Sequence, residues 1–148
     1  MMYVVMTGTA GDVGAEKLYN EHRAELEAKY SPSYCRRFLS LSEEISDTIP
    51  EGLISVPMTS GVYDALWKIG EMADCGLEII HCEIPIKQET IEICETLGEN
   101  PYEQASCGSL YLTDEPTFGR VIGHTTDSAA KTVMMKSGIR YLNRPQTD

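Results

Sequence analysis

The sequence has no apolar run that approaches the roughly 18 residues needed to cross a membrane, and its start lacks the basic and apolar regions of a signal peptide. We therefore expect a cytoplasmic protein without membrane contact. Clusters of Lys and Arg are also lacking, since 12 basic side chains stand against 23 acidic ones and give a net charge of −11. Such a surface repels nucleic acid and anionic membranes, which excludes functions that need a basic patch.

Cysteine pairs of the Cys-x-x-Cys type are absent. The five cysteines are scattered, at Cys35, Cys75, Cys82, Cys94 and Cys107. In a reducing compartment we expect them to be small buried hydrophobic side chains. His81 adjoins Cys82, but no spacing fits a zinc pattern and strand neighbours point to opposite faces, so no metal site is expected. A nucleophilic cysteine–histidine pair from distant parts of the chain stays open.

What is present is the patterning of a single domain over residues 1–148. Apolar runs predict strands over 3–6, 53–57, 77–84, 108–113, 120–126, 131–135 and 139–142, and apolar stripes predict helices over 14–30, 34–49, 62–75 and 88–97. Two consecutive helices after the first strand favour a mixed or parallel sheet. A turn at 127–130 predicts a hairpin between its flanking strands, and 143–148 form a polar tail.

The most informative stretch follows the first strand, where three glycines alternate with polar residues. These candidate site residues are Thr7, Gly8, Thr9, Gly11, Asp12 and Gly14. Glycines bring bare N–H groups to one point and a helix N-terminus is partly positive, so the loop can hold a phosphate or carboxylate. The spacing matches neither the P-loop nor the dinucleotide fingerprint, and such a loop is more often a plain turn. Asp12 can bind Mg²⁺ beside a nucleotide or simply stabilise the helix end.

A second candidate loop precedes the helix that contains Trp67. Its site residues are Thr59, Ser60 and Gly61, and we expect Thr59 or Ser60 to cap that helix. Neither loop contains a residue pattern that identifies a catalytic group.

Five stretches, in order along the chain, resemble the C-terminal domain of the AIR synthase-related superfamily, in its hydrogenase maturation factor and hydrogenase expression/formation protein E branch. They are 5–14, 61–73, 84–102, 106–110 and 121–124. The resemblance implies an α/β (α+β) layered fold with a mixed β-sheet and helices, partly ferredoxin-like. It also implies ATP-dependent phosphorylation chemistry, with ATP and Mg²⁺ held largely by a separate N-terminal domain and the glycine-rich loops closing the cleft.

Four departures from the family pattern shape the expected function. The chain starts at the first strand of the C-terminal half, so we expect it to lack the ATP-binding domain. The family's Asp-x-Thr-x-Gly-Gly loop aligns with Val56, Met58, Ser60 and Gly61, which removes its acidic residue and its threonine. The tail has no counterpart of the C-terminal cysteine of the E-type proteins. The connection at 113–119 is too short for the family's helix, which leaves apolar sheet surface for a partner.

Three functions remain open on these grounds. The first is a stand-alone, partly degenerate domain that binds a partner or ligand without catalysis, as a homodimer or in a complex with another protein. The second is one half of a split ATP-dependent enzyme, in which a separate ATP-binding subunit supplies metal and phosphate ligands. The third is a structural or regulatory module in which the glycines serve folding only. We rank them in this order.

Overall fold

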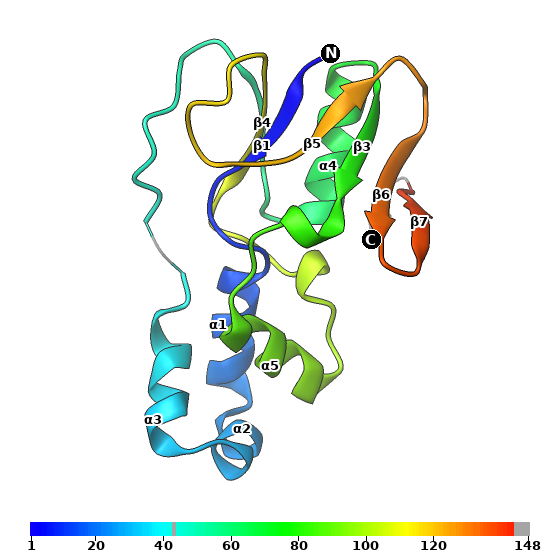
Figure 1. The fold of residues 1–148 in the computed structure, drawn as a ribbon. Helices are drawn as coiled ribbons and strands as arrows, with labels where there is room; N and C mark the ends of the chain where they lie inside the picture. Colours follow the sequence, from blue (N-terminus) through cyan, green and yellow to red (C-terminus); the bar gives the residue numbers. More distant parts are fainter. Residues whose placement is uncertain (43, 144–148) are drawn as a thin grey trace.

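The computed structural model describes residues 1–42 and 44–143. A sheet with one long helix forms one end of the molecule, and a group of shorter helices forms the other (Figure 1). Within the described residues, no helix is both long enough and apolar enough to cross a membrane. Of the polar tail predicted over 143–148, all but Asn143 lies outside the described residues.

In the described part of the chain, seven strands form one sheet in the order β2-β4-β1-β5-β3-β6-β7. They are β1 (Tyr3–Met6), β2 (Ile54–Pro57), β3 (Gly76–Ile80), β4 (Ser109–Thr113), β5 (Arg120–Thr126), β6 (Lys131–Met135) and β7 (Gly138–Tyr141). Neighbouring strands are antiparallel except β3 and β6, which run parallel. The predicted α+β fold with a mixed sheet is thus confirmed.

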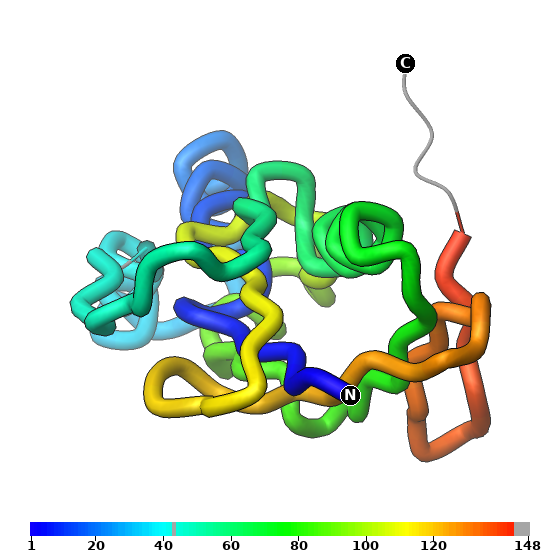
Figure 2. The backbone as a smooth tube through the Cα atoms, turned by 90° about the horizontal axis from the view of Figure 1, so that it is seen from above, coloured from blue at the N-terminus to red at the C-terminus, as the bar shows by residue number. Residues whose placement is uncertain are grey.

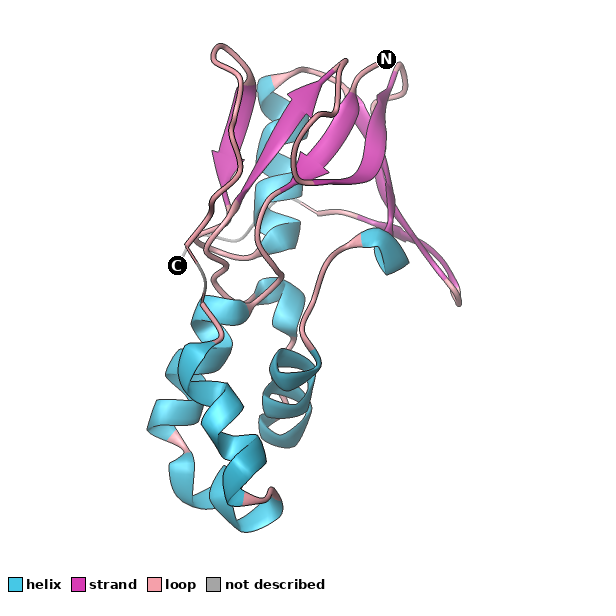
Figure 3. Ribbon diagram, turned by 60° about the vertical axis from the view of Figure 1, so that its left-hand side comes forward, coloured by secondary structure: helices cyan, strands magenta, loops and turns pink. Residues whose placement is uncertain are grey.

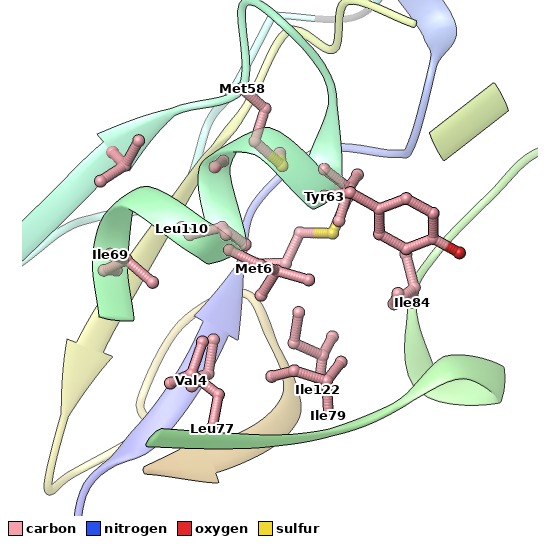
Figure 4. Close-up of a cluster of buried hydrophobic side chains, with 14 of the residues drawn as sticks. Val4, Met6, Met58, Tyr63, Ile69, Leu77, Ile79, Ile84, Leu110 and Ile122 are labelled. Atoms are coloured by element: carbon pink, nitrogen blue, oxygen red, sulfur yellow. The ribbon is translucent and has the colours of Figure 1, made fainter. Parts of the chain in front are cut away.

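Helix α4 (Val62–Met72) covers one face of the sheet, which we call the inner face (Figures 2 and 3). Its buried side chains, among them Leu66 and Ile69, recur at helical spacing. They pack with inward strand residues such as Val4 and Met6 of β1 into the main hydrophobic core (Figure 4). Because alternate strand residues point to opposite faces, the other residues of each strand lie on the outer face.

The helices at the other end of the molecule (Figure 1) enclose a second cluster of buried side chains, which we call the helical cluster. It is built by α1 (Asp12–Glu21), α2 (Arg23–Lys29), α3 (Pro32–Cys35), the 3₁₀ turn η1 (Arg36–Ser40) and α5 (Gln88–Leu97). Phe38 is fully buried there. The rings of Tyr19, Tyr30 and Tyr34 lie 5.1, 5.6 and 5.2 Å from its ring, in tilted or edge-on contacts that aromatic pairs prefer.

The first two predicted helices differ from the structure. The helix expected over 14–30 breaks at His22, whose backbone (φ −128°, ψ 37°) leaves the helical region, so that α1 and α2 are separate. His22 is not packed in the core but partly exposed, 3.5 Å from Glu25. The helix expected over 34–49 stops at Ser40, because the next N–H group, that of Leu41, donates to the Glu16 carboxylate instead of a helical carbonyl.

Two strand predictions also need correction. The strand expected over 77–84 ends at Ile80, and the chain continues as the 3₁₀ turn η2 (His81–Glu83), so His81 and Cys82 do not alternate across a strand. The hairpin expected between β5 and β6 is wrong, since β6 crosses to the far side of β3 and pairs with it in parallel. Gly76 permits this crossing, because a Cβ there would overlap the Ser128 carbonyl oxygen.

Candidate functional site

The predicted glycine loop lies at the end of β1 and packs against residues 101–109, which include the 3₁₀ turn η3 (Pro101–Glu103). Gly8 and Gly11 adopt φ values of 73° and 69°, in the left-handed region that favours glycine. Several N–H groups of the loop donate within the protein, from Ala10 to the Pro85 carbonyl (2.8 Å), from Gly11 to the Ser106 hydroxyl (2.7 Å) and from Gly14 to the Ala105 carbonyl (3.0 Å). These three amides are therefore engaged by protein acceptors.

Asp12 is buried in the first turn of α1, with 1% of its surface exposed. Its Oδ1 accepts the N–H groups of Val13 (2.8 Å) and Cys107 (3.0 Å), and its Oδ2 accepts the Cys107 thiol (2.8 Å). Both carboxylate oxygens thus tie α1 to the 101–109 segment, which satisfies a buried charge with hydrogen bonds. Binding of Mg²⁺ by Asp12 stays a prediction.

The two threonines of the loop have different surroundings. Thr7 is 2% exposed, and its Oγ1 accepts the Ser109 N–H at 2.9 Å, which continues the pairing of β1 with β4. The Thr9 hydroxyl is buried, and within the described residues it has no hydrogen-bond partner. A buried hydroxyl without a hydrogen bond lowers the stability of the folded protein. A ligand that donates to or accepts from the Thr9 hydroxyl would supply the missing hydrogen bond.

The second candidate loop meets the same segment. The Met58 N–H donates to the Gly108 carbonyl at 3.2 Å, and the Met58 carbonyl accepts the Ser106 N–H at 2.9 Å. The structure therefore brings both predicted loops together on either side of residues 101–109. Ser106 and Gly108 were apparent in the sequence only as part of a family resemblance, and nothing local marked them as the common partner of the two loops.

The start of α4 differs from the prediction that Thr59 or Ser60 caps it. Gly61 occupies the cap position with φ 97°, and no side chain caps the helix. A Cβ at Gly61 would lie 2.7 Å from the Tyr102 carbonyl oxygen, so the close approach of η3 requires glycine. Thr59 and Ser60 are exposed on the loop before it.

A stack of four side chains, which we call the ring stack, borders these loops. Arg140 lies 4.5 Å above the Tyr63 ring, Tyr63 stacks on Tyr102 at 5.5 Å, and the His81 ring is 4.6 Å from Tyr102. The members come from β7, α4, η3 and η2, so no local sequence pattern could reveal the stack. Burial, and secondarily Arg140, lowers the pKa of His81, and its Nε2 is buried without a partner among the described residues.

The lowered pKa of His81 predicts a pH-dependent stability. Unfolded chains bind a proton at His81 near its usual pKa of about 6.5, whereas the folded protein resists protonation. We therefore expect this group to contribute stability above about pH 6.5 that is lost as pH falls toward its lower folded pKa. Urea unfolding at pH 7.5 and pH 5.5 measures the loss. It should shrink in His81→Gln, and equal losses in both proteins would contradict the prediction.

The cysteines and acidic side chains of the described residues were also candidates for metal binding or thiol chemistry. Within residues 1–42 and 44–143, no group of three or more His, Cys, Asp or Glu side chains is placed to hold a metal ion. Cys35 and Cys94 are buried as predicted, whereas Cys82 is exposed. Burial raises the pKa of the Cys35 thiol and raises that of Cys94 to about 11, so both thiols stay protonated and unreactive.

The outer face of the sheet carries exposed apolar side chains around a hollow of about 410 Å³. These exposed side chains form what we call the outer-face patch. They are Tyr3, Ile80, Val121, Met134, Ile139 and Tyr141. Pairing places Ile80 beside Met134 and Met134 beside Ile139, so they form a row across three strands. The short connection before β5 covers only the neighbouring region, where Phe118 packs on Tyr111 at 5.3 Å. As predicted, part of this face is left open.

The fold and the site define an α+β domain in which two glycine-containing loops converge on one segment below a mixed sheet. No family model matches the chain. It is 23% identical over 109 residues to a Methanocaldococcus jannaschii protein that bears the name of a hydrogenase expression/formation protein, covering 74% of this chain and 32% of that protein.

Solved structures share the fold. A chain of the HypE–HypF complex is 19% identical, with a TM-score of 0.68 and coverage of 97% of this chain and 53% of that chain. Escherichia coli HypE, a hydrogenase maturation protein, is 17% identical, with a TM-score of 0.69 and coverage of 99% and 50%. Thiamine monophosphate kinase from Aquifex aeolicus is 18% identical, with a TM-score of 0.54 and coverage of 89% and 49%.

The chain therefore has the fold expected from its resemblance to the AIR synthase-related superfamily. It spans about half the length of the solved chains that it matches and about a third of the curated relative, which fits a C-terminal domain.

Proposed function

We propose that the chain is a partner-binding module with a HypE-like fold, which forms a homodimer through the outer-face patch and does not catalyse a reaction alone. The observation that carries this proposal is the patch itself. Its side chains keep between 36% and 63% of their surface exposed, although they are large and apolar. A contiguous apolar surface of this kind is typical of a protein interface, because its burial against a partner is favourable.

The charges around the patch support a second copy of this chain as the partner. The Glu78 carboxylate is 3.2 Å from His124 Nε2, and the Glu83 carboxylate is 2.7 Å from Arg120. Because each carboxylate already has a partner on its own chain, two copies can meet without bringing an unpaired carboxylate into the interface. The net charge of −11 disfavours self-association over long range, but salt screens charges farther apart than about 8–10 Å.

The glycine loop supports the absence of independent catalysis. The amides of Ala10, Gly11 and Gly14 donate to protein acceptors, and both oxygens of Asp12 accept hydrogen bonds. A loop that cradles phosphate needs several N–H groups that point to the ligand. With these groups engaged, nucleotide binding by this loop alone is expected to be weak.

The dimer is tested with two matched methionine substitutions. Met134 is 50% exposed in the patch, whereas Met72 is 60% exposed on α4. Light scattering should give a dimer mass for the wild type at tens of micromolar protein, in the range of modest-affinity dimers. Met134→Glu should weaken the dimer at least about 100-fold, because it buries an unpaired charge in the interface. Met72→Glu should leave the dimer intact.

Two outcomes of the scattering measurement would overturn the homodimer. One is a monomer mass for the wild type throughout this range. The other is an equal effect of Met134→Glu and Met72→Glu, which would place the interface elsewhere. In the first case the outer-face patch would need a different protein as its partner.

A second candidate function is one half of a split ATP-dependent enzyme. Solved structures with this fold include HypE in complex with ATP, a HypE–HypF complex, and a thiamine monophosphate kinase complexed with AMPPCP and TMP. In this proposal the Gly8–Gly14 loop and residues 59–61 bind phosphate of an ATP·Mg²⁺ complex that a separate ATP-binding subunit holds. The unpartnered Thr9 hydroxyl favours a ligand at that loop. Calorimetric titration of ATP·Mg²⁺ should give little heat with the isolated chain, and strong binding would favour this function over the first.

A further inference from the structure

The helical cluster contains a hollow that neither proposed function uses. It has a volume of about 510 Å³ and is lined by residues of α1, α2, α3 and η1 together with Tyr30. Pockets for small ligands usually measure about 300–1,000 Å³. These helices form the end of the molecule away from the sheet (Figure 1).

The floor of the hollow is apolar. Tyr19 and Cys35 lie at its base, 2% and 5% exposed, and the accessible apolar surface comes from Tyr30, Pro32 and Leu39. Both tyrosine rings pack on Phe38, which holds them in place. The Cys35 thiol is protonated because burial raises its pKa, so it acts as a neutral surface. Such a floor suits a flat, apolar body such as an aromatic ring.

The rim of the hollow is positively charged, which is unusual on a chain with a net charge of −11. Two guanidinium groups, those of Arg23 and Arg36, line it. Arg23 lies 5.2 Å above the Tyr19 ring and donates to Asn20 at 3.0 Å. Within the described residues, neither guanidinium forms an ion pair with a carboxylate.

One carboxylate, that of Glu27, also lines the hollow, so the lining has one positive charge in excess. Glu27 Oε1 accepts the Tyr19 hydroxyl at 3.2 Å, so it is held toward the tyrosine. The hollow thus combines two guanidinium groups, one carboxylate that accepts the Tyr19 hydroxyl, and an apolar floor. Guanidinium groups bind carboxylates and phosphates through paired hydrogen bonds and also stack on flat rings.

We propose that this hollow binds a small organic anion with a flat apolar body and one carboxylate or phosphate group. The apolar body lies against Tyr30 and Leu39, and the anionic group meets Arg23 and Arg36 at the rim. Charge complementarity therefore selects an anion over a neutral molecule of the same shape. This site is separate from the glycine loop and from the outer-face patch, so its failure would leave both proposed functions untouched.

The test is an NMR titration of the full chain with 2-naphthoate as the probe, compared with neutral 2-naphthalenemethanol and with inorganic phosphate. Backbone amide shifts should concentrate in residues 19–39 for naphthoate. The neutral compound should bind at least about tenfold more weakly, because it lacks the group that pairs with the guanidiniums, and phosphate should bind weakly because it lacks the apolar body.

Two matched charge reversals make the test specific. Arg36→Glu should weaken naphthoate binding at least about tenfold, since a carboxylate at the rim repels the anion. Arg37→Glu should have little effect, because Arg37 does not line the hollow and lies 3.8 Å from Glu89. Both side chains are exposed, so both variants should fold. No shifts in residues 19–39 up to millimolar naphthoate, equal binding of the neutral compound, or equal effects of the two reversals would each overturn the proposal.

Discussion

Replacing Gly11 by valine is expected to destabilise the protein by at least about 3 kcal/mol or to prevent folding, through backbone strain and a steric clash together. The φ of 69° at Gly11 is unfavourable for a β-branched residue. A Cβ at this position would also overlap the Pro101 carbonyl oxygen, which is backbone and cannot move aside alone. The substitution would therefore force η3 away from the loop and break the contacts between them.

Gly52→Val is the matched control for this prediction. Gly52 has a φ of 83°, but a Cβ there would have no atom within 4 Å. The control therefore contains the backbone strain without the clash. Urea unfolding should show a clearly larger loss of stability for Gly11→Val, and equal losses in the two variants would contradict the role given to the contact with Pro101.

This expected loss also affects how nucleotide binding is tested. A loss of ATP binding in Gly11→Val would not separate a phosphate site from misfolding. Thr59→Ala and Ser60→Ala are better variants, because both residues are exposed and their removal leaves the packing of the loops intact. A change of nucleotide affinity in these variants would then report on contact with the ligand.

Replacing Phe38 by alanine is expected to lower the free energy of unfolding by about 3–5 kcal/mol, the range for a fully buried aromatic side chain. Phe38 is 0% exposed and contacts three tyrosine rings. Its removal would leave a cavity in the helical cluster that these rings cannot fill without losing their other contacts. For example, the Tyr30 hydroxyl donates to Glu92 Oε2 at 2.6 Å, which holds its ring against α5.

Leu39→Ala is the control for this second prediction. Leu39 is the next residue in η1 and is 49% exposed, so its truncation should cost less than about 1 kcal/mol. Urea unfolding at a fixed pH measures both variants. A loss below about 1 kcal/mol for Phe38→Ala would show that the helical cluster is not a tightly packed core.

Elements with strong local signals could be predicted from the sequence. The β-branched run of β1, the apolar stripe of α4 and the glycine after α5 depend on neighbours a few residues away. Strand β1 and helix α5 have the expected bounds, whereas α4 begins as expected at Val62 and ends at Met72, before the expected residue 75. Gly98, for instance, ends α5 with φ 71°, as a glycine after a helix often does. The convergence of the two loops followed from no local signal, although both loops had been identified separately.

The failed predictions share one physical cause, which is that distant contacts overrode local preference. Leu41 and the residues after it have a helical apolar stripe, but the Glu16 carboxylate takes the Leu41 N–H. The pairing of β6 with β3 depends on the backbone contact at Gly76, which no spacing in the sequence reveals. The ring stack likewise joins four elements that are far apart along the chain.

The position of β1 in the middle of the sheet has a consequence for protein synthesis. Val4 pairs with Leu112 on one side and with Gly123 on the other, so β1 cannot pair with either neighbour until residues far along the chain have been synthesised. Contacts this far apart in sequence slow folding. During that wait, the apolar β1 strand is exposed to other nascent chains, and chaperones that shield apolar strands are expected to improve the yield of folded protein.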